Sequence, residues 1–254
     1  MSTIVLIPGA WHTPAAYAEF TTALRTLGHE VHVPRLTTLN GSRPPNTDLG
    51  TDTDLIRTYV ESLASAGRSI TVLMHSYGGQ VGTNALAGLG RESRAAKGLP
   101  GGVVGLLYIA AATLTEGRSM MDFVVEHGHG HLMELAFDFA GDGTCVSRDP
   151  KGLVVGGGRS DEDTEAYIAG FERWNGKGFS GKLGACAWRE IGEVGYLHAT
   201  LDMTLPYEYQ KDYVQLMRDA GVRVRTWELE TGHCPTFTRF EEMAGIVDGF
   251  VRGK

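Results

Sequence analysis

The strongest constraint on the fold is an apolar run that ends at a serine. Residues 70–74 are apolar, His75 and Ser76 follow, and small residues then lead into a helical pattern at residues 80–89. A strand, a tight turn and a helix in this order lift the serine Oγ above the end of a sheet. The backbone amide of the next residue, Tyr77, then points towards an oxyanion forming on a bound molecule. The stretch therefore predicts Ser76 as a nucleophile.

Apolar runs and helical patterns alternate along much of the chain. The runs at residues 70–74 and 103–111 are continuous, as expected of central parallel strands that are covered on both faces. We therefore predict an α/β protein with a doubly wound, mostly parallel sheet. Strands are predicted at residues 4–7, 31–33, 70–74, 103–111, 196–201 and 222–229. Helices are predicted at 14–27, capped by Thr13, at 55–63, 80–89 and 206–220, and up to about Arg252 after a capping box of Thr238 and Glu241.

One long segment, residues 115–188, breaks this alternation. It shows no clear strand, contains two glycine clusters, and has a helical pattern after Ser160 that carries Tyr167, Ile168, Phe171 and Trp174. An insertion of this length in a compact domain, rich in large apolar residues, predicts a lid over a ligand site. The alternative is a surface insertion that covers no ligand site. The predicted division is a core of residues 1–114 and 189–254 and a lid of residues 115–188.

Composition excludes several classes of partner. The net charge of −7 disfavours nucleic acid and anionic membranes, which both attract basic patches. No run of about 18 apolar residues predicts a membrane span, and no basic segment typical of a secretory signal precedes the first apolar run. The three cysteines are odd in number and widely spaced, which predicts free thiols and a cytoplasmic location. The oligomeric state stays open, and a homodimer is compatible with the sequence.

Two further residues follow predicted strands in places that suit a serine nucleophile. Asp202 follows the strand at 196–201, and His233 follows the strand at 222–229. A nucleophilic serine needs a neutral imidazole to take its proton, and the imidazole needs a carboxylate to orient it. The carboxyl ends of parallel strands meet at one edge of a sheet. Each residue alone has a structural explanation, but their joint placement predicts a catalytic triad of Ser76, His233 and Asp202.

The turn after the first strand, residues 8–12, is the expected source of a second oxyanion donor. The backbone amide of Ala10 is the first choice, paired with that of Tyr77, and the amide of Trp11 is the alternative. His75 has a second interpretation as a buried histidine with backbone partners. The residues expected to line a substrate pocket are His12, His75, Met120, Phe123, Phe137 and Trp174.

Three alternating histidines, His127, His129 and His131, raise the question of a metal site. Zinc sites in proteins usually combine such residues with cysteine or carboxylate ligands. No such ligand set lies nearby in the sequence, so a polar lid loop is the favoured interpretation. No metal and no cofactor are predicted.

Together these motifs resemble the α/β-hydrolase superfamily along nearly the whole chain. The resemblance rests on residues 4–11, 75–79 and 202–206, on Gly232-His233, and on the chain order of serine, aspartate and histidine. The chain is similar to the small-lid group of plant methylesterases and hydroxynitrile lyases. It is more similar to fungal proteins of secondary-metabolite pathways, with the phrases PGAWH, HSYGGQVG and GGVVGLLYIAA. The resemblance implies a six-stranded parallel sheet that lacks the first two strands of the superfamily sheet.

The chain also departs from that pattern. Met74 stands where the nucleophile turn usually has glycine, at a point where strand and helix pass closely, and Gly78 and Gly79 are expected to leave the room for it. Hydroxynitrile lyases of this group have threonine at the position of Gly9 and lysine at that of Cys234. Cyanohydrin cleavage is therefore disfavoured.

Three functions fit the sequence. The first is a serine hydrolase that cleaves an ester, lactone or thioester of an apolar small molecule through an acyl-enzyme, and the apolar lid suggests an aromatic or polyketide-like group. The second is a biosynthetic lyase, dehydratase, cyclase or carbon–carbon-cleaving enzyme that reuses the same pocket, because function lies in the site and not in the fold. The third is a ligand-binding receptor.

Overall fold

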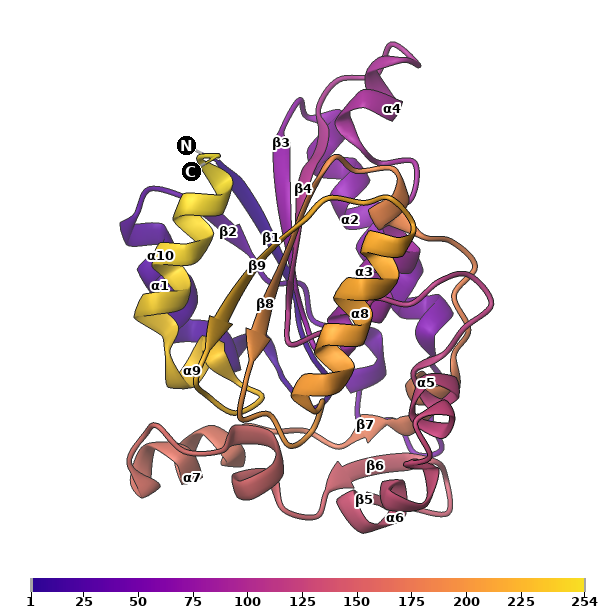
Figure 1. Cartoon of the computed structure of the whole chain (residues 1–254), viewed down its shortest axis with the longest axis vertical. Helices are drawn as coiled ribbons and strands as arrows, with labels where there is room; N and C mark the ends of the chain where they lie inside the picture. The colour runs from indigo at the N-terminus through magenta and orange to yellow at the C-terminus, as the bar shows by residue number, and fades with distance from the viewer. Residues whose placement is uncertain (1, 254) are drawn as a thin grey trace.

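A six-stranded parallel sheet forms the centre of the protein in the computed structural model, which describes residues 2–253 (Figure 1). The strand order is β2-β1-β3-β4-β8-β9, and every neighbouring pair is parallel. This confirms the predicted doubly wound, six-stranded α/β fold. The strands are β1 (Thr3–Ile7), β2 (Glu30–His32), β3 (Ser69–His75), β4 (Gly102–Ile109), β8 (Glu193–Ala199) and β9 (Val224–Leu229).

Helices cover both faces of the sheet (Figure 1). In β1, Ile4 and Leu6 pack in the apolar cluster of α1 and α10, whereas Val5 and Ile7 pack in the cluster of α2, α3 and α8. Alternate residues of a strand point to opposite faces, so a continuous apolar run serves two cores at once. The covering helices are α1 (Ala18–Thr26), α2 (Leu49–Ser65), α3 (Tyr77–Ala85), α8 (Tyr207–Asp219) and α10 (Phe240–Val251). None of the helices within residues 2–253 combines the length and the hydropathy of a membrane-spanning segment.

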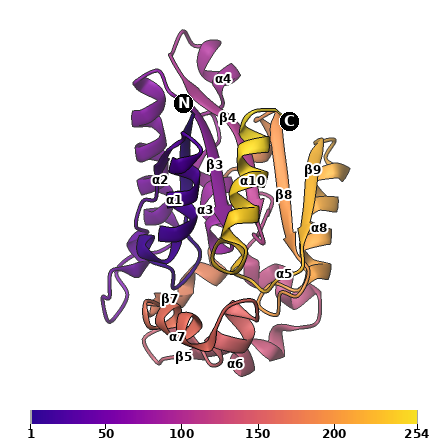
Figure 2. The same cartoon turned by 90° about the vertical axis from the view of Figure 1, so that its left-hand side faces the viewer.

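Residues 115–188 lie across the carboxyl ends of the strands, below the sheet in Figure 1 and again in the turned view of Figure 2. They contain a three-stranded antiparallel sheet, so the expectation of no strand was wrong. These strands have two to four residues, too few for an alternating pattern to show in the sequence. The elements are α5 (Met120–Glu126), α6 (Met133–Ala136), β5 (Phe137–Phe139), β6 (Thr144–Ser147), α7 (Asp161–Ala169) and β7 (Trp174–Asn175).

The remaining short helices are α4 (Arg91–Ala95), α9 (Pro235–Thr238), a π-helix at Pro150–Val155, and 3-10 turns at Pro14–Tyr17, Thr37–Leu39, Gly130–Leu132, Gly176–Ser180 and Ala187–Arg189.

Three local predictions about helices need correction. Helix α7 ends at Ala169, so Phe171 and Trp174 lie beyond it. Thr13 precedes a 3-10 turn without a side-chain cap. The expected capping box at the last helix does not form, because the Thr238 hydroxyl bonds the backbone oxygen of Cys234 at 3.0 Å and α10 begins after Arg239.

The room for Met74 comes from a glycine other than the two expected. A Cβ placed on Gly82 would lie 2.4 Å from Met74 Sδ and 2.9 Å from Ile7 Cδ1. A Cβ on Gly78 would instead meet the backbone oxygen of Ile7 at 2.4 Å, and one on Gly79 would meet that of Ala112 at 2.5 Å. Gly82 therefore accommodates the Met74 side chain, while Gly78 and Gly79 let α3 start against the backbone ends of β1 and β4.

We predict that Gly82→Ala lowers the free energy of unfolding by about 1–3 kcal/mol, because the new methyl group overpacks a fully buried contact. The double variant with Met74→Ala should lose less unfolding free energy than the sum of the two single losses. The methyl group added at position 82 would then fill space that the Met74 side chain has left. Urea unfolding of the three variants measures this. Additive losses would show that Gly82 and Met74 do not share space.

Gly245→Ala is the matched control for this series. Gly245 lies inside α10, and a Cβ there would meet nothing within 4 Å. The same substitution should therefore stabilise the protein, by about 0.5–1 kcal/mol, because alanine loses less backbone entropy in a helix than glycine.

Candidate active site

Ser76 occupies a strained turn between β3 and α3. Its φ of 54° and ψ of −121° lie in a region that residues with a side chain rarely adopt, at a cost of about 1–3 kcal/mol. Backbone bonds hold the turn in place. The amide of Ser76 donates to the oxygen of Ile109 at 3.3 Å, and the oxygen of Ser76 accepts from the amides of Gly79 at 2.9 Å and Ala112 at 3.3 Å.

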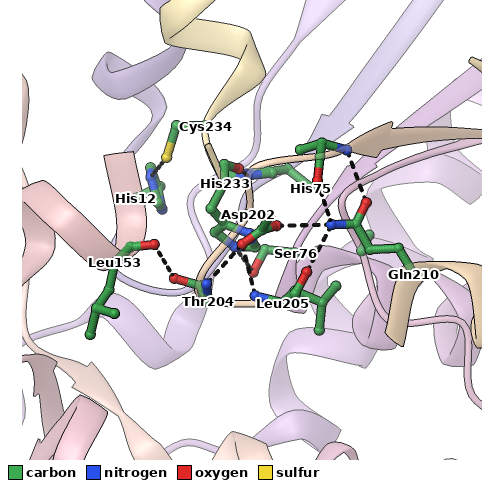
Figure 3. Close-up of polar contacts among 12 residues, drawn as sticks. His12, His75, Ser76, Leu153, Asp202, Thr204, Leu205, Gln210, His233 and Cys234 are labelled. Carbon is green, nitrogen blue, oxygen red and sulfur yellow. Dashed lines mark hydrogen bonds and ion pairs between the residues drawn. The ribbon is translucent and has the colours of Figure 1, made fainter. Parts of the chain in front are cut away.

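The structure brings Ser76, His233 and Asp202 together in a hydrogen-bonded line (Figure 3). Ser76 Oγ lies 2.7 Å from His233 Nε2, and His233 Nδ1 lies 2.6 Å from Asp202 Oδ2. The histidine and aspartate side chains are buried. An ionised carboxylate only accepts hydrogen bonds, so Nδ1 carries the imidazole proton and Nε2 is left to accept one from the serine hydroxyl.

Asp202 is held by a shell of donors that the sequence did not reveal (Figure 3). Its Oδ1 accepts from the amides of Thr204 and Leu205, both at 2.8 Å. Its Oδ2 accepts from Gln210 Nε2 at 3.2 Å, in addition to His233. Gln210 is fully buried in α8 and also bonds the amide and the oxygen of Ala199, at 2.9 and 3.0 Å. A glutamine on the buried face of the 206–220 helical pattern was the signal that could have found it.

Hydrogen bonds through His75, at the end of β3, connect the loops that carry Gly9 and His233. The amide of Gly9 donates to Tyr17 Oη at 3.0 Å, Tyr17 Oη lies 2.8 Å from His75 Nδ1, and His75 Nε2 lies 2.8 Å from the oxygen of His233. A carbonyl oxygen only accepts, so Nε2 carries the proton and Nδ1 accepts from the Tyr17 hydroxyl. Burial lowers the pKa of His75 well below its usual value, which keeps the ring neutral. His75 is thus the buried histidine with a backbone partner.

Three residues at the wall of the cavity have a backbone amide without an acceptor in the described part of the chain. Ala10, Trp11 and Tyr77 line the same cavity as Ser76 and His233. Within residues 2–253, no carbonyl or side chain accepts from the amides of Ala10 or Trp11. Tyr77 is the first residue of α3, where a backbone N–H has no partner inside the helix. These amides are available to an oxygen that binds beside Ser76.

A buried carboxylate fixes the side chain of Tyr77. Asp52 Oδ2 accepts from Tyr77 Oη at 3.1 Å and from Thr38 Oγ1 at 2.6 Å, and Trp174 Nε1 donates to the same threonine oxygen at 3.0 Å. Burial raises the pKa of Asp52, and the hydroxyl donors oppose that rise. Trp174 accordingly lies behind Tyr77 and outside the cavity wall.

The cavity at Ser76 is small and apolar, with a volume of about 50 Å³. Met120 and Phe137 line it as expected, whereas His12, His75, Phe123 and Trp174 lie outside its wall. A second cavity of about 100 Å³ shares part of this wall, including Val124 and Thr204. The cavity at Ser76 is called the inner cavity below, and the second one the outer cavity. Side chains of the inner wall that the sequence did not single out are Val124, Met133, Phe179, Leu205, Tyr209 and Tyr213.

The segment 115–188 is bonded directly to the loop that carries Ala10 and Trp11. Trp11 Nε1 donates to the oxygen of Cys145 at 3.1 Å, the amide of Glu172 donates to the oxygen of Trp11 at 2.9 Å, and the Trp11 ring stacks on Phe137 at 5.5 Å. The ring of His12 lies 4.6 Å from that of Phe171. The wall of the cavity and the loop beside Ser76 are therefore fixed by the same contacts.

Two of the three alternating histidines join α5 and its following turn to α8. His127 Nε2 lies 2.8 Å from Asp212 Oδ2, and His129 Nδ1 lies 2.5 Å from Tyr209 Oη. Among residues 2–253, no three histidine, cysteine or acidic side chains gather as a metal site.

Comparison with known proteins identifies the family. The sequence matches the family model described as the Alpha/beta hydrolase family over residues 4–246. The chain belongs to the alpha/beta hydrolase family. This α/β hydrolase is 26% identical over 246 residues to the "Probable hydrolase R7" of a Phoma species, covering 96% of each chain. It is 31% identical over 120 residues to the "Alpha/beta hydrolase nvfD" of Aspergillus novofumigatus, covering 46% of each chain.

Solved structures show the same fold at low identity. The methylesterase MES16 from Arabidopsis superposes with a TM-score of 0.77 at 14% identity, covering all of both chains. Polyneuridine aldehyde esterase superposes with a TM-score of 0.76 at 15% identity, covering 99% of each chain. An extracellular alpha/beta-hydrolase from a Paenibacillus species gives 0.75 at 19% identity, covering 97% of this chain and 98% of its own. The family match and the names of the fungal relatives support an α/β-hydrolase enzyme, and the superpositions show its fold.

The buried ring of His12 makes the stability of this α/β hydrolase depend on pH. Burial lowers the pKa of His12 to about 3, against a backbone bond to the oxygen of Ala10 that raises it. Below about pH 6.5, His12 is protonated in the unfolded chain but stays neutral in the folded protein. The free energy of unfolding therefore falls as the pH falls towards 3. His12→Phe should make this fall shallower by up to about 1.4 kcal/mol per pH unit. Urea unfolding between about pH 7 and pH 4 measures both slopes, and parallel slopes would contradict the assignment.

Proposed function

We propose that this α/β hydrolase is a serine hydrolase that cleaves an ester, lactone or thioester of an apolar small molecule through an acyl-enzyme. The observation that carries the proposal is the line from Ser76 Oγ through His233 to Asp202, at 2.7 and 2.6 Å, at the wall of an apolar cavity. The strained backbone of Ser76 supports it, because strain of this kind concentrates at functional sites.

In the proposed reaction, Ser76 Oγ attacks the substrate carbonyl while His233 Nε2 takes the hydroxyl proton. Asp202 stabilises the imidazolium that results. The carbonyl oxygen, now negative, accepts from the amides of Ala10 and Tyr77, with the Trp11 amide as the alternative donor. His233 then gives its proton to the leaving alcohol or thiol. A water molecule attacks the acyl carbonyl as His233 takes a proton from it. His233 then gives this proton to Ser76 Oγ as the bond between Oγ and the acyl carbon breaks and the carboxylic acid leaves.

We further propose that residues 115–188 act as a lid on a core of residues 1–114 and 189–254. The inner cavity of about 50 Å³ accommodates only part of an aromatic ester, so the rest of a substrate would extend into the outer cavity beside Leu132 and Met203. Aromatic and methionine side chains on both walls favour an aromatic or polyketide-like group. A role in secondary metabolism and a cytoplasmic location are also part of this proposal, and the three buried free cysteines are compatible with that location.

We predict that Ser76→Ala lowers kcat/KM for p-nitrophenyl esters by at least about 10⁴-fold, because the oxyanion donors alone retain only a small part of the catalysis. Ester screening with the parent protein and this variant measures the loss. An unchanged circular dichroism spectrum and unfolding midpoint are the controls for folding. An active Ser76→Ala protein would refute the proposed nucleophile.

The acyl-enzyme separates hydrolysis from a lyase or cyclase reaction in the same cavity. Asp202→Asn slows deacylation, because it disturbs the tautomer of His233 that activates water. Intact-protein mass spectrometry of this variant during turnover should show the mass of one acyl group added. Turnover without any adduct, in this variant and in the parent, would favour the non-hydrolytic alternative.

A further inference from the structure

Most tyrosine hydroxyls of this protein form a hydrogen bond with another residue. Of the nine tyrosines, two have a hydroxyl without a hydrogen bond among residues 2–253, namely Tyr167 and Tyr213. The Tyr167 hydroxyl is sealed inside the protein. The seven bonded hydroxyls belong to Tyr17, Tyr59, Tyr77, Tyr108, Tyr196, Tyr207 and Tyr209.

Tyr213 lines the cavity at Ser76, and none of the described residues hydrogen-bonds its hydroxyl. The residue is 1% exposed and lines that cavity, and its hydroxyl is not among the sealed polar atoms that lack a partner. The ring is held in place by Phe123, which stacks on it at 4.2 Å, and the backbone of α8 is tied there by the Thr113 hydroxyl, which donates to the oxygen of Tyr213 at 3.1 Å. A buried hydroxyl with no partner is unfavourable unless a ligand or water satisfies it.

The other hydroxyls of the cavity wall are already used. Tyr77 Oη donates to Asp52, Thr204 Oγ1 donates to the oxygen of Leu153 at 2.8 Å, and Tyr209 Oη bonds His129. The Ser76 hydroxyl belongs to the line with His233. Tyr213 is therefore the one side chain of the described wall with an unengaged neutral donor.

We propose that the Tyr213 hydroxyl is a substrate-binding group that hydrogen-bonds an uncharged polar substituent of the substrate, away from the reacting carbonyl. This inference rests on the proposed use of the cavity as the substrate site. The wall of the inner cavity contains no lysine, arginine, aspartate or glutamate, so a charged substituent would be buried without a partner. The substrate class is thus an aromatic or similarly flat apolar ester or lactone that carries a hydroxyl, ether or carbonyl oxygen on its ring system.

The test uses Tyr213→Phe, which removes only the oxygen, in a Ser76→Ala background that prevents turnover. Calorimetry compares the binding of methyl benzoate with that of its meta- and para-hydroxylated analogues. We expect Tyr213→Phe to weaken the binding of at least one hydroxylated ester by roughly three- to tenfold, the range of one neutral hydrogen bond, while methyl benzoate is unaffected.

Tyr207→Phe is the matched control. Tyr207 is the first residue of the same helix, and its hydroxyl bonds Glu228 outside the cavity. This variant should leave the affinity for all three esters unchanged. Equal affinities of the Tyr213→Phe variant and its parent for every ester, an equal loss for all three, or no binding at all would overturn the inference.

Hydrolysis of the same esters by the protein with Ser76 intact is measured separately. A selective loss of affinity in Tyr213→Phe, without turnover by the parent, would refute the proposed hydrolase function and leave the Tyr213 assignment standing. Turnover by the parent without a selective loss of affinity in Tyr213→Phe would refute the Tyr213 assignment and leave the proposed hydrolase function standing.

Discussion

The close approach of α3 to the ends of β1 and β4 is the constraint on which the rest of the site depends. Gly78 and Gly79 allow the first turn of α3 to lie against the backbone oxygens of Ile7 and Ala112, at distances that no side chain would permit. The chain can reverse this tightly only if Ser76 takes a positive φ. Backbone hydrogen bonds hold this conformation of Ser76, which lines one cavity together with Ala10 and Tyr77.

A continuous set of buried hydrogen bonds then fixes the loops relative to one another. Tyr17 and His75 connect the loop of Gly9 to the backbone of His233, and Gln210 connects Asp202 to the end of β8. Because the direction of each bond is set by an acceptor that cannot donate, the proton positions are set as well. Side chains held in this way need no rearrangement if charge develops beside them, and such preorganisation is a main source of catalysis in enzymes.

The sequence predicted the six strands and the three residues at their ends because both follow from local patterns. A continuous apolar run marks a central strand such as β3, which Ser76 follows directly, and Asp202 and His233 lie in the loops that follow β8 and β9. Gln210 and Tyr213 were not assigned in the same way, since they reach the site from the side of helix α8 and not from the end of a strand. The strands β5 to β7 are too short for a pattern, and the role of Gly82 depends on a contact between β3 and α3 that only the folded backbone shows.

The proposed function depends on Ser76 being a nucleophile that its position in the fold activates. Labelling the folded protein with a fluorophosphonate, followed by peptide mass spectrometry, tests it most directly, because this reagent reacts with activated serines and spares ordinary ones. We expect one adduct per chain, on the peptide that contains Ser76, and no adduct after unfolding. An unlabelled native protein, or an adduct on a different residue, would contradict it.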